Sequence, residues 1–221
     1  MDIGILGSGN LAVTLGQAWV GAGHKVLLAG RDLGRAQHAA RHIGPTAGAV
    51  SAEELAAHSE VVVIAIAWSG LESALALAGA HEGRLSGKTV IDTTNPVDYA
   101  TGRLLPSSGS AAELVARVAT GSHVVKALHL FAGASWPYSG DAARAPIVAL
   151  CGDRAEALTR AGTLITALGG RPLAIGGLDA ARQAEEVAGF VTRIVANGAN
   201  PRLAIPEVHP ATAPTTSTDS Q

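Results

Sequence analysis

The sequence has few cysteines, few aromatic residues and no long hydrophobic run. Its single cysteine, Cys151, excludes an intramolecular disulfide and fits a reducing compartment. The longest unbroken apolar stretch, residues 61–68, is far shorter than the roughly 20 residues that cross a bilayer. The formal net charge of −2 gives no electrostatic reason to expect nucleic acid or an anionic membrane as a partner.

Two further absences narrow the class of protein. The first predicted strand begins at Asp2, which leaves no room for a secretion signal, so we expect a cytoplasmic protein. The histidines are scattered, without a neighbouring cysteine or aspartate cluster, so we expect no metal site. With 48% apolar and 15% charged residues, the chain has the composition of a compact globular enzyme or binding domain.

What the chain does have is a glycine turn between an apolar strand, residues 3–6, and a helical pattern that reaches Val20. Such a turn binds a dinucleotide pyrophosphate, because glycine lets the backbone approach the phosphates and the helix start presents free N–H groups. In this turn Gly7 permits the tight bend and Gly9 lets the backbone approach a phosphate, so both are predicted cofactor contacts, and the small Ala12 lets the helix pack closely on the strand. A purely structural turn is the alternative interpretation.

The next predicted strand ends at Ala29, where an acidic residue would accept from the ribose 2′-hydroxyl of NAD. Here Gly30 and Arg31 follow instead, and Arg35 lies one turn along the next helix. Arginine binds a 2′-phosphate in a bidentate manner, so we expect NADPH to be preferred over NADH. Asp32 suits the N-cap of that helix. The alternative is that both arginines only solvate the helix start.

Strands and helices alternate along the chain, which predicts an α/β fold with a doubly wound parallel sheet. We assign residues 1–152 to an NADP-binding Rossmann domain and residues 153–205 to an α/β extension that completes the sheet and cleft. Residues 206–221 are rich in proline, threonine and serine, which predicts a disordered tail. The last helix, predicted over residues 178–197, has an apolar face that is either core or a dimer seam.

Several motifs together resemble one known family. They are the glycine turn, Arg31, Ala67-Trp68, Asn95-Pro96, the segment from Lys126 to His129, and Gly176, Leu178, Arg182 and Glu185 in the pattern G-x-L-x-x-x-R-x-x-E. In these the chain resembles the NADP oxidoreductases that depend on coenzyme F420, a deazaflavin hydride carrier. The likeness extends over residues 2–205.

The resemblance implies a Rossmann sheet with a small C-terminal helical subdomain, and a homodimer. It implies phosphate contacts from Ser8 to Leu11, and 2′-phosphate contacts at Gly30, Arg31 and Arg35. The nicotinamide would lie near Ala67, Trp68 and Asn95, with the deazaflavin stacked over it against residues 129–133. Hydride transfer between the two carriers needs orientation more than acid–base groups.

The chain departs from the family where the acceptor would stack. Family members typically read T-I-P-A after the histidine, whereas this chain has Leu130-Phe131-Ala132-Gly133. Phe131, Trp136 and Tyr138 would reshape the cleft for a small organic C=O, C=N or C=C acceptor. In that second interpretation His129 is the candidate proton donor, and Tyr138 a weaker one. For His129 the alternative is a neutral, structural ring, and for the chain a third interpretation is a dinucleotide sensor without activity.

Overall fold

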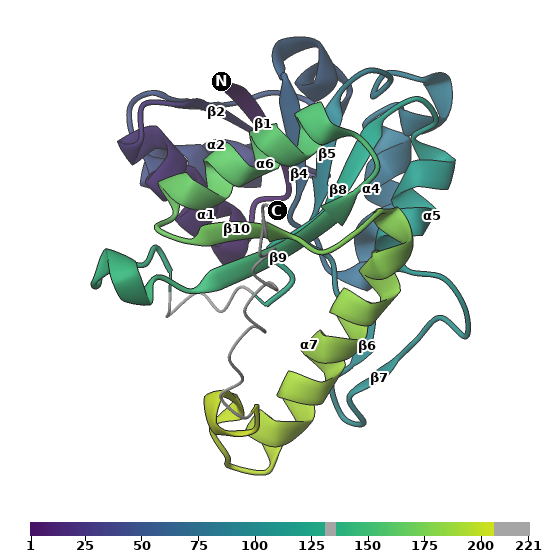
Figure 1. Cartoon of the computed structure of the whole chain (residues 1–221). Coiled ribbons are helices and arrows are strands. Elements are labelled where there is room, and N and C mark those ends of the chain that lie inside the picture. Colours follow the sequence, from purple (N-terminus) through teal and green to yellow (C-terminus); the bar gives the residue numbers. More distant parts are fainter. Residues whose placement is uncertain (131–135, 206–221) are drawn as a thin grey trace, which may run out of the picture.

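The computed structural model describes residues 1–130 and 136–205. Its centre is an eight-stranded sheet with the order β10-β9-β8-β5-β4-β1-β2-β3 (Figure 1). The strands are β1 (Asp2–Leu6), β2 (Lys25–Ala29), β3 (Ala47–Ala49), β4 (Val61–Ile64), β5 (Thr89–Asp92), β8 (His123–Lys126), β9 (Ile147–Gly152) and β10 (Arg171–Ala174). From β1 the chain proceeds outward to β3, then returns to β4 and continues the other way. The β1–β4 boundary is therefore the switch point at which such sheets bind ligands.

The parallel doubly wound sheet is confirmed from β3 through β8, but β9 runs antiparallel to β8. A parallel partner would need a helical crossover. In its described part, the connection from β8 to β9 holds one 3-10 turn, Ala142–Arg144, and therefore returns without crossing over. β10 pairs parallel to β9 across the predicted domain boundary at residue 152. The predicted tail, residues 206–221, lies outside the described residues.

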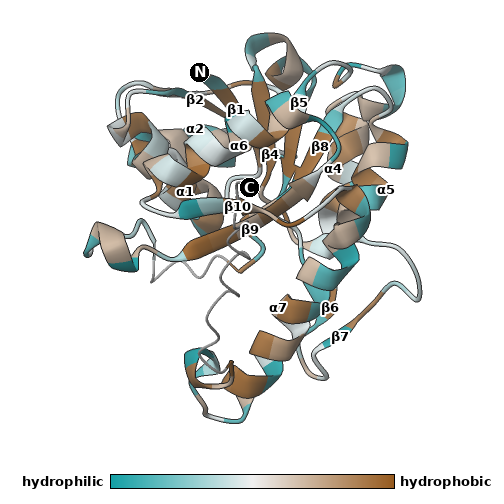
Figure 2. Ribbon diagram, in the orientation of Figure 1, coloured by the Kyte–Doolittle hydropathy of each residue, from teal (hydrophilic) through white to brown (hydrophobic). Residues whose placement is uncertain are grey.

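Helices cover both faces of the sheet. One face carries α1 (Asn10–Gly21), α2 (Leu33–Ile43) and α6 (Ala155–Ala167), and the other carries α3 (Ala52–Leu55), α4 (Leu71–Leu77) and α5 (Ala111–Val118). The central strands are predominantly hydrophobic (Figure 2), as expected for strands buried on both sides. Trp19, predicted as helix core, is fully buried and its Nε1–H donates to the Leu164 carbonyl at 3.0 Å.

Side-chain caps fix the starts of α2, α3 and α5. Asp32 accepts from the backbone N–H of Arg35, and Ser110 accepts from that of Glu113. Ser51 and Glu54 form a reciprocal capping box at α3. The Asp32 cap confirms the helix start predicted there from the sequence.

The predicted loop at residues 99–109 contains part of a small hairpin, β6 (Val97–Asp98) and β7 (Arg103–Leu104). It packs against α7 (Ala181–Ala196), which projects below the sheet in Figure 1. The approach is close, because a Cβ on Gly189 of α7 would collide with the carbonyl oxygen of Gly102. Of the predicted apolar face of α7, Ala184 and Ala188 are buried, Val191 and Ile194 are half-buried, and Val195 is exposed. The homodimer stays a prediction.

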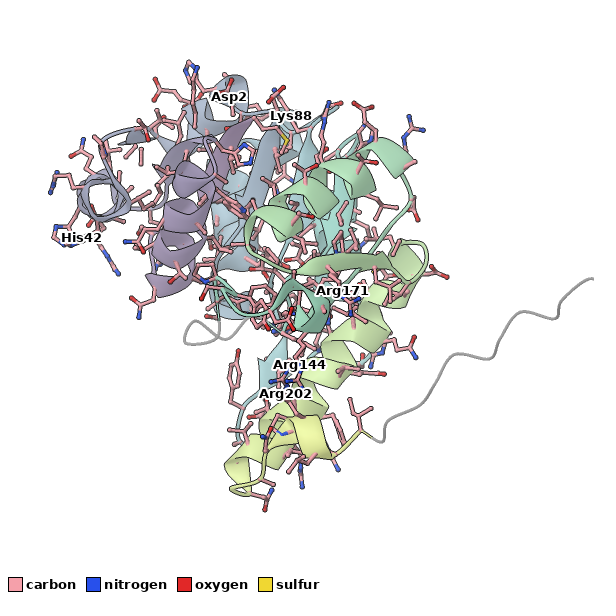
Figure 3. The ribbon with its side chains drawn as sticks, turned by 60° about the vertical axis from the view of Figure 1, so that its left-hand side comes forward. Asp2, His42, Lys88, Arg144, Arg171 and Arg202 are labelled. Atoms are coloured by element: carbon pink, nitrogen blue, oxygen red, sulfur yellow. The ribbon has the colours of Figure 1, made fainter. Side chains whose placement is uncertain are left out.

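The two edges of the sheet differ in what they carry. Figure 3 shows Asp2 and Lys88, which lie at the amino ends of β1 and β5, at the same edge. The residues that follow the parallel strands lie at the opposite, carboxyl edge. The predicted strand at residues 61–67 ends at Ile64, because residues 65–68 turn away to line this carboxyl edge. Within the described chain no helix is long and apolar enough to cross a membrane.

Candidate functional site

Two cavities lie side by side at the carboxyl edge of the sheet. The first, of about 450 Å³, lies beside the end of β2 and is called the Arg31 cavity. The second, of about 460 Å³, lies beyond the ends of β4, β5 and β8 and is called the His129 cavity. Both are lined by Gly9 and residues 65–67. They therefore form one continuous groove across the switch point.

The structure brings together the predicted cofactor contacts and His129. The Arg31 cavity is lined, among others, by Gly7, Ser8, Gly9, Gly30, Arg31, Arg35 and Ala67. The His129 cavity is lined, among others, by Gly9, Asn10, Leu11, Ala67, Trp68, Asn95 and His129. An extended ligand that reached from Arg31 to His129 would touch each of them in turn.

The start of α1 fits a pyrophosphate. Its N-cap is Gly9, which supplies no side-chain cap, and its first turn holds no acidic residue. A Cβ at Gly9 would meet no atom within 4 Å, so space is open beside the free N–H groups. Gly7 has φ of 137° and lies against the Ala65 carbonyl, so only glycine suits the turn. Unlike α2, α3 and α5, this helix start is left free for an anion.

Two arginines give the Arg31 cavity positive charge. Arg31 and Arg35 are exposed, and neither has an ion-pair partner within residues 1–130 and 136–205. The Asp32 carboxylate accepts from the Arg35 N–H at 3.0 Å and is thereby engaged in capping α2. These arginines fit a 2′-phosphate better than a bare ribose hydroxyl.

Beneath the His129 cavity lies a buried charge cluster that the sequence did not reveal as a unit. Lys126 Nζ contacts Asp92 Oδ2 at 2.9 Å and Glu185 Oε1 at 2.8 Å, and the three side chains are fully buried. Glu185 also accepts from the backbone N–H of Ala111 at the start of α5. The cluster therefore ties β5, β8, α5 and α7 together at one point.

Burial raises the pKa of Glu185, and the Lys126 ammonium opposes that rise. The available sequence signal was a lone lysine inside a strand, Lys126, which is consistent with either an edge position or a partner on another element. Glu185 appeared only as a motif residue.

The same cluster holds the loop after β5. Asp92 Oδ1 accepts from the Thr94 N–H at 2.9 Å, and Lys126 Nζ donates to the Thr94 carbonyl. Next along, Asn95 Nδ2 donates to the His129 carbonyl at 2.6 Å. The loop after β5 and the loop after β8 are thus joined where they line the cavity.

His129 is a neutral ring at pH 7. Burial, together with the nearby Lys126 charge, lowers its pKa to about 4, and the Asp92 charge opposes that fall. The preceding residue, Leu128, has φ of 58°, a left-handed backbone that is uncommon outside glycine and concentrates at functional sites. The arrangement fixes the ring at the cavity wall.

The remaining candidates lie elsewhere. Tyr138 donates to the Asp141 carbonyl at 3.2 Å and is not among the described lining residues of the His129 cavity. Phe131 lies outside the described residues. Burial raises the pKa of Cys151 to about 11, in keeping with the predicted structural thiol. Among residues 1–130 and 136–205 there is no group of three or more histidine, cysteine and acidic residues suited to a metal.

Replacing Lys126 should destabilise the whole fold. In Lys126→Met two buried carboxylates lose their counter-charge, and breaking a buried pair in this way costs about 3–5 kcal/mol. We expect a large fall in the free energy of unfolding, measured by urea denaturation. Lys88→Met, which removes a partly exposed lysine bonded to the Ser59 carbonyl, is the control. Equal losses in the two variants would contradict a central role for the cluster.

His129 should make stability depend on pH. Its folded pKa of about 4 lies below its ordinary value of 6.5, so the unfolded chain binds more protons between these values. Its contribution is therefore complete above pH 6.5 and is lost as the pH falls toward 4. We expect unfolding free energy to fall more steeply over this window in the wild type than in His129→Gln. Parallel curves would show that the ring is not buried as a neutral group.

Comparison with known proteins agrees with this geometry. The family described as NADP oxidoreductase, coenzyme F420-dependent, matches residues 2–96. A solved structure from Arthrobacter sp. FB24, provisionally assigned as an F420-dependent NADP reductase, is 28% identical with a TM-score of 0.77. That alignment covers 90% of this chain and 96% of the Arthrobacter chain.

Two further proteins are matched over only part of their own length. Metalloreductase STEAP3 of Rattus norvegicus is 30% identical over 191 residues, which make up 84% of this chain but only 36% of the rat protein. A reductive aminase from Aspergillus terreus, solved with NADPH, shares the fold with a TM-score of 0.66 at 16% identity. That alignment covers 89% of this chain and 63% of the aminase. The chain therefore carries an NADP-binding oxidoreductase domain, and its residues 2–96 match the family of coenzyme F420-dependent NADP oxidoreductases.

Proposed function

We propose that the protein transfers hydride between NADPH and a deazaflavin carrier, coenzyme F420, bound over the nicotinamide. The observation that carries this proposal is the continuous groove, whose two cavities share Gly9 and residues 65–67. One cavity has arginines for a 2′-phosphate, and the other is large enough for a second planar ring. The family that matches residues 2–96 and the similar Arthrobacter structure support the same carrier.

The residues divide the work of binding. The N–H groups at the start of α1 hold the pyrophosphate, and Arg31 and Arg35 hold the 2′-phosphate. Residues 67, 68 and 95 border the nicotinamide, which supplies the hydride when bound. Holding both rings at contact distance in a cavity shielded from water is the main catalytic contribution, since hydride transfer between carriers depends on orientation.

His129 borders the acceptor in this proposal without acting as an imidazolium acid. A ring with a pKa of about 4 is unprotonated at neutral pH. A proton needed at the acceptor then comes from solvent, which suits a carrier. The role of His129 is to form one wall and to hold the Asn95 amide through its backbone carbonyl.

The alternative function is an NADPH-dependent reductase of a small organic C=O, C=N or C=C bond. It is favoured by the departure of residues 130–133 from the family sequence. In that case the wall next to His129 fits a smaller acceptor. The cytoplasmic location and the homodimer remain predictions under either function.

Arg31 should decide the choice of dinucleotide. A charged hydrogen bond is worth about 1.5–3 kcal/mol, so Arg31→Ala should weaken NADPH binding about 10–100-fold and leave NADH binding almost unchanged. Fluorescence titration of both cofactors measures this. Arg41→Ala, in the last turn of α2 and away from the cavity, should behave like the wild type. A preference unchanged by Arg31→Ala would remove the arginine from the 2′-phosphate site.

The acceptor is tested by mixing protein, NADPH and oxidised coenzyme F420 in a stopped-flow instrument and following the deazaflavin absorbance. We expect rapid, protein-dependent bleaching that is much slower with NADH. Tight NADPH binding with an unbleached deazaflavin would reject the carrier function and leave the small organic acceptor.

A further inference from the structure

Two histidines on α2 lie outside the groove described above. His38 and His42 are four residues apart, so they lie on the same side of the helix, one turn from each other. Both are exposed, and Figure 3 shows His42 pointing away from the body of the molecule. Neither residue lines the Arg31 cavity or the His129 cavity. The histidines are scattered along the sequence, but the helix brings these two together.

The two imidazole rings meet through their Nε2 atoms. His38 Nε2 and His42 Nε2 are 2.9 Å apart, and the ring planes stand at 87° to each other. In a neutral pair, one Nε2–H donates to the Nε2 lone pair of the other ring. If the donor ring moves its proton to Nδ1, both Nε2 lone pairs become free at the same place. One change of tautomer therefore turns this hydrogen bond into a pair of metal ligands.

The distance between the two nitrogens matches one kind of metal coordination. Metal–imidazole bonds are about 2.0–2.1 Å long, so two such bonds at a right angle place their nitrogens about 2.9 Å apart. Two bonds at the tetrahedral angle place them about 3.3 Å apart. Right angles between ligands are typical of square-planar and tetragonal Cu²⁺ and Ni²⁺, which imidazole suits.

The space beside the pair has room for an ion with its water. Both histidines line a cavity of about 570 Å³ beside α1 and α2, called the His38 cavity. Asp32 is the acidic residue among its described lining residues, and its carboxylate is engaged in capping α2. Arg35 lies on the same wall and repels cations. An ion held here must therefore depend on bonds to the two ring nitrogens.

We propose that His38 and His42 form a two-histidine binding site for a divalent transition-metal ion of the Cu²⁺ or Ni²⁺ type. The two Nε2 atoms take adjacent coordination positions, and water fills the others. In the described chain no third histidine, cysteine or acidic residue joins the pair. The site is independent of the proposed hydride transfer, because neither ring lines the groove.

Titration calorimetry of the untagged chain with Ni²⁺ tests the site. We expect His38→Gln and His42→Gln each to weaken Ni²⁺ binding at least about tenfold, because the second nitrogen of a chelate binds at a high effective concentration. Both side chains are exposed, so the two variants should fold like the wild type, which circular dichroism checks.

Two other histidines provide the controls. His81 is exposed, and His24 Nδ1 lies 3.3 Å from the α-amino group of Met1, which makes it part of another close pair of nitrogens. His81→Gln and His24→Gln should each bind Ni²⁺ as the wild type does. A loss of affinity in either control, a loss in only one of the two α2 variants, or no binding by the wild type would overturn the inference.

The choice of ion separates a nitrogen chelate from a loosely held cation. We expect Cu²⁺ to bind more tightly than Ni²⁺, and Ni²⁺ more tightly than Co²⁺ and Mn²⁺, which is the usual order for nitrogen ligands. Mg²⁺ prefers oxygen ligands and should not bind. Binding of Mg²⁺ as tightly as Ni²⁺ would contradict a site made of two imidazoles.

Thermal unfolding gives an independent readout. The chelate needs the folded helix, so the ion binds the folded chain in preference to the unfolded one. At a Ni²⁺ concentration about ten times its Kd, the Tm of the wild type should rise by about 3–5 °C. The double variant His38→Gln/His42→Gln should show no rise. An equal rise in both proteins would place the ion elsewhere and overturn the inference.

Discussion

The arrangement of residues at the carboxyl edge of the sheet depends on the ion pairs that the Lys126 ammonium makes. It joins a carboxylate from β5 to a carboxylate from α7 inside the core, where neither could remain ionised alone without a large desolvation cost. Such clusters contribute little net stability compared with apolar packing, but they fix geometry. Here the geometry fixed is that of Thr94 and, through Asn95, of the segment around His129. A cluster that touches no ligand therefore sets the shape of the cavity that does.

The groove uses two kinds of chemistry along its length. At the arginine end, exposed cations and an uncapped helix start meet a polyanionic cofactor in water, where long-range attraction assists binding. At the other end the walls are neutral and the charges are hidden below. A chain with almost no net charge can therefore bind a highly charged molecule at one end of the groove and present an uncharged surface at the other.

Local sequence patterns located most of the elements around the Arg31 cavity because the residues that form them are contiguous. The turn from Gly7 to Leu11, the step from β2 to Arg31 and the caps at Asp32, Ser51 and Ser110 are each written within a few residues. The acceptor half depends on residues far apart in the chain, such as Lys126 with Glu185, and no periodicity pairs them. The antiparallel β9 and the hairpin β6–β7 were missed for a similar reason. Strand direction depends on the connection, and two-residue strands carry too little pattern to be recognised.

The contact between Gly102 and Gly189 has a consequence for how this enzyme can diversify. The hairpin that supplies Val97, Tyr99 and Leu105 to the cavity packs on α7 with backbone against backbone. It therefore cannot move closer to α7, and only side chains added at this contact would move it away. Because Glu185 of α7 also contacts Lys126 below the cavity, this one helix sets the distance between the hairpin and the buried charge cluster. New acceptors would then be accommodated by exchanging side chains on the hairpin, while the distance between the hairpin and the charge cluster stays unchanged.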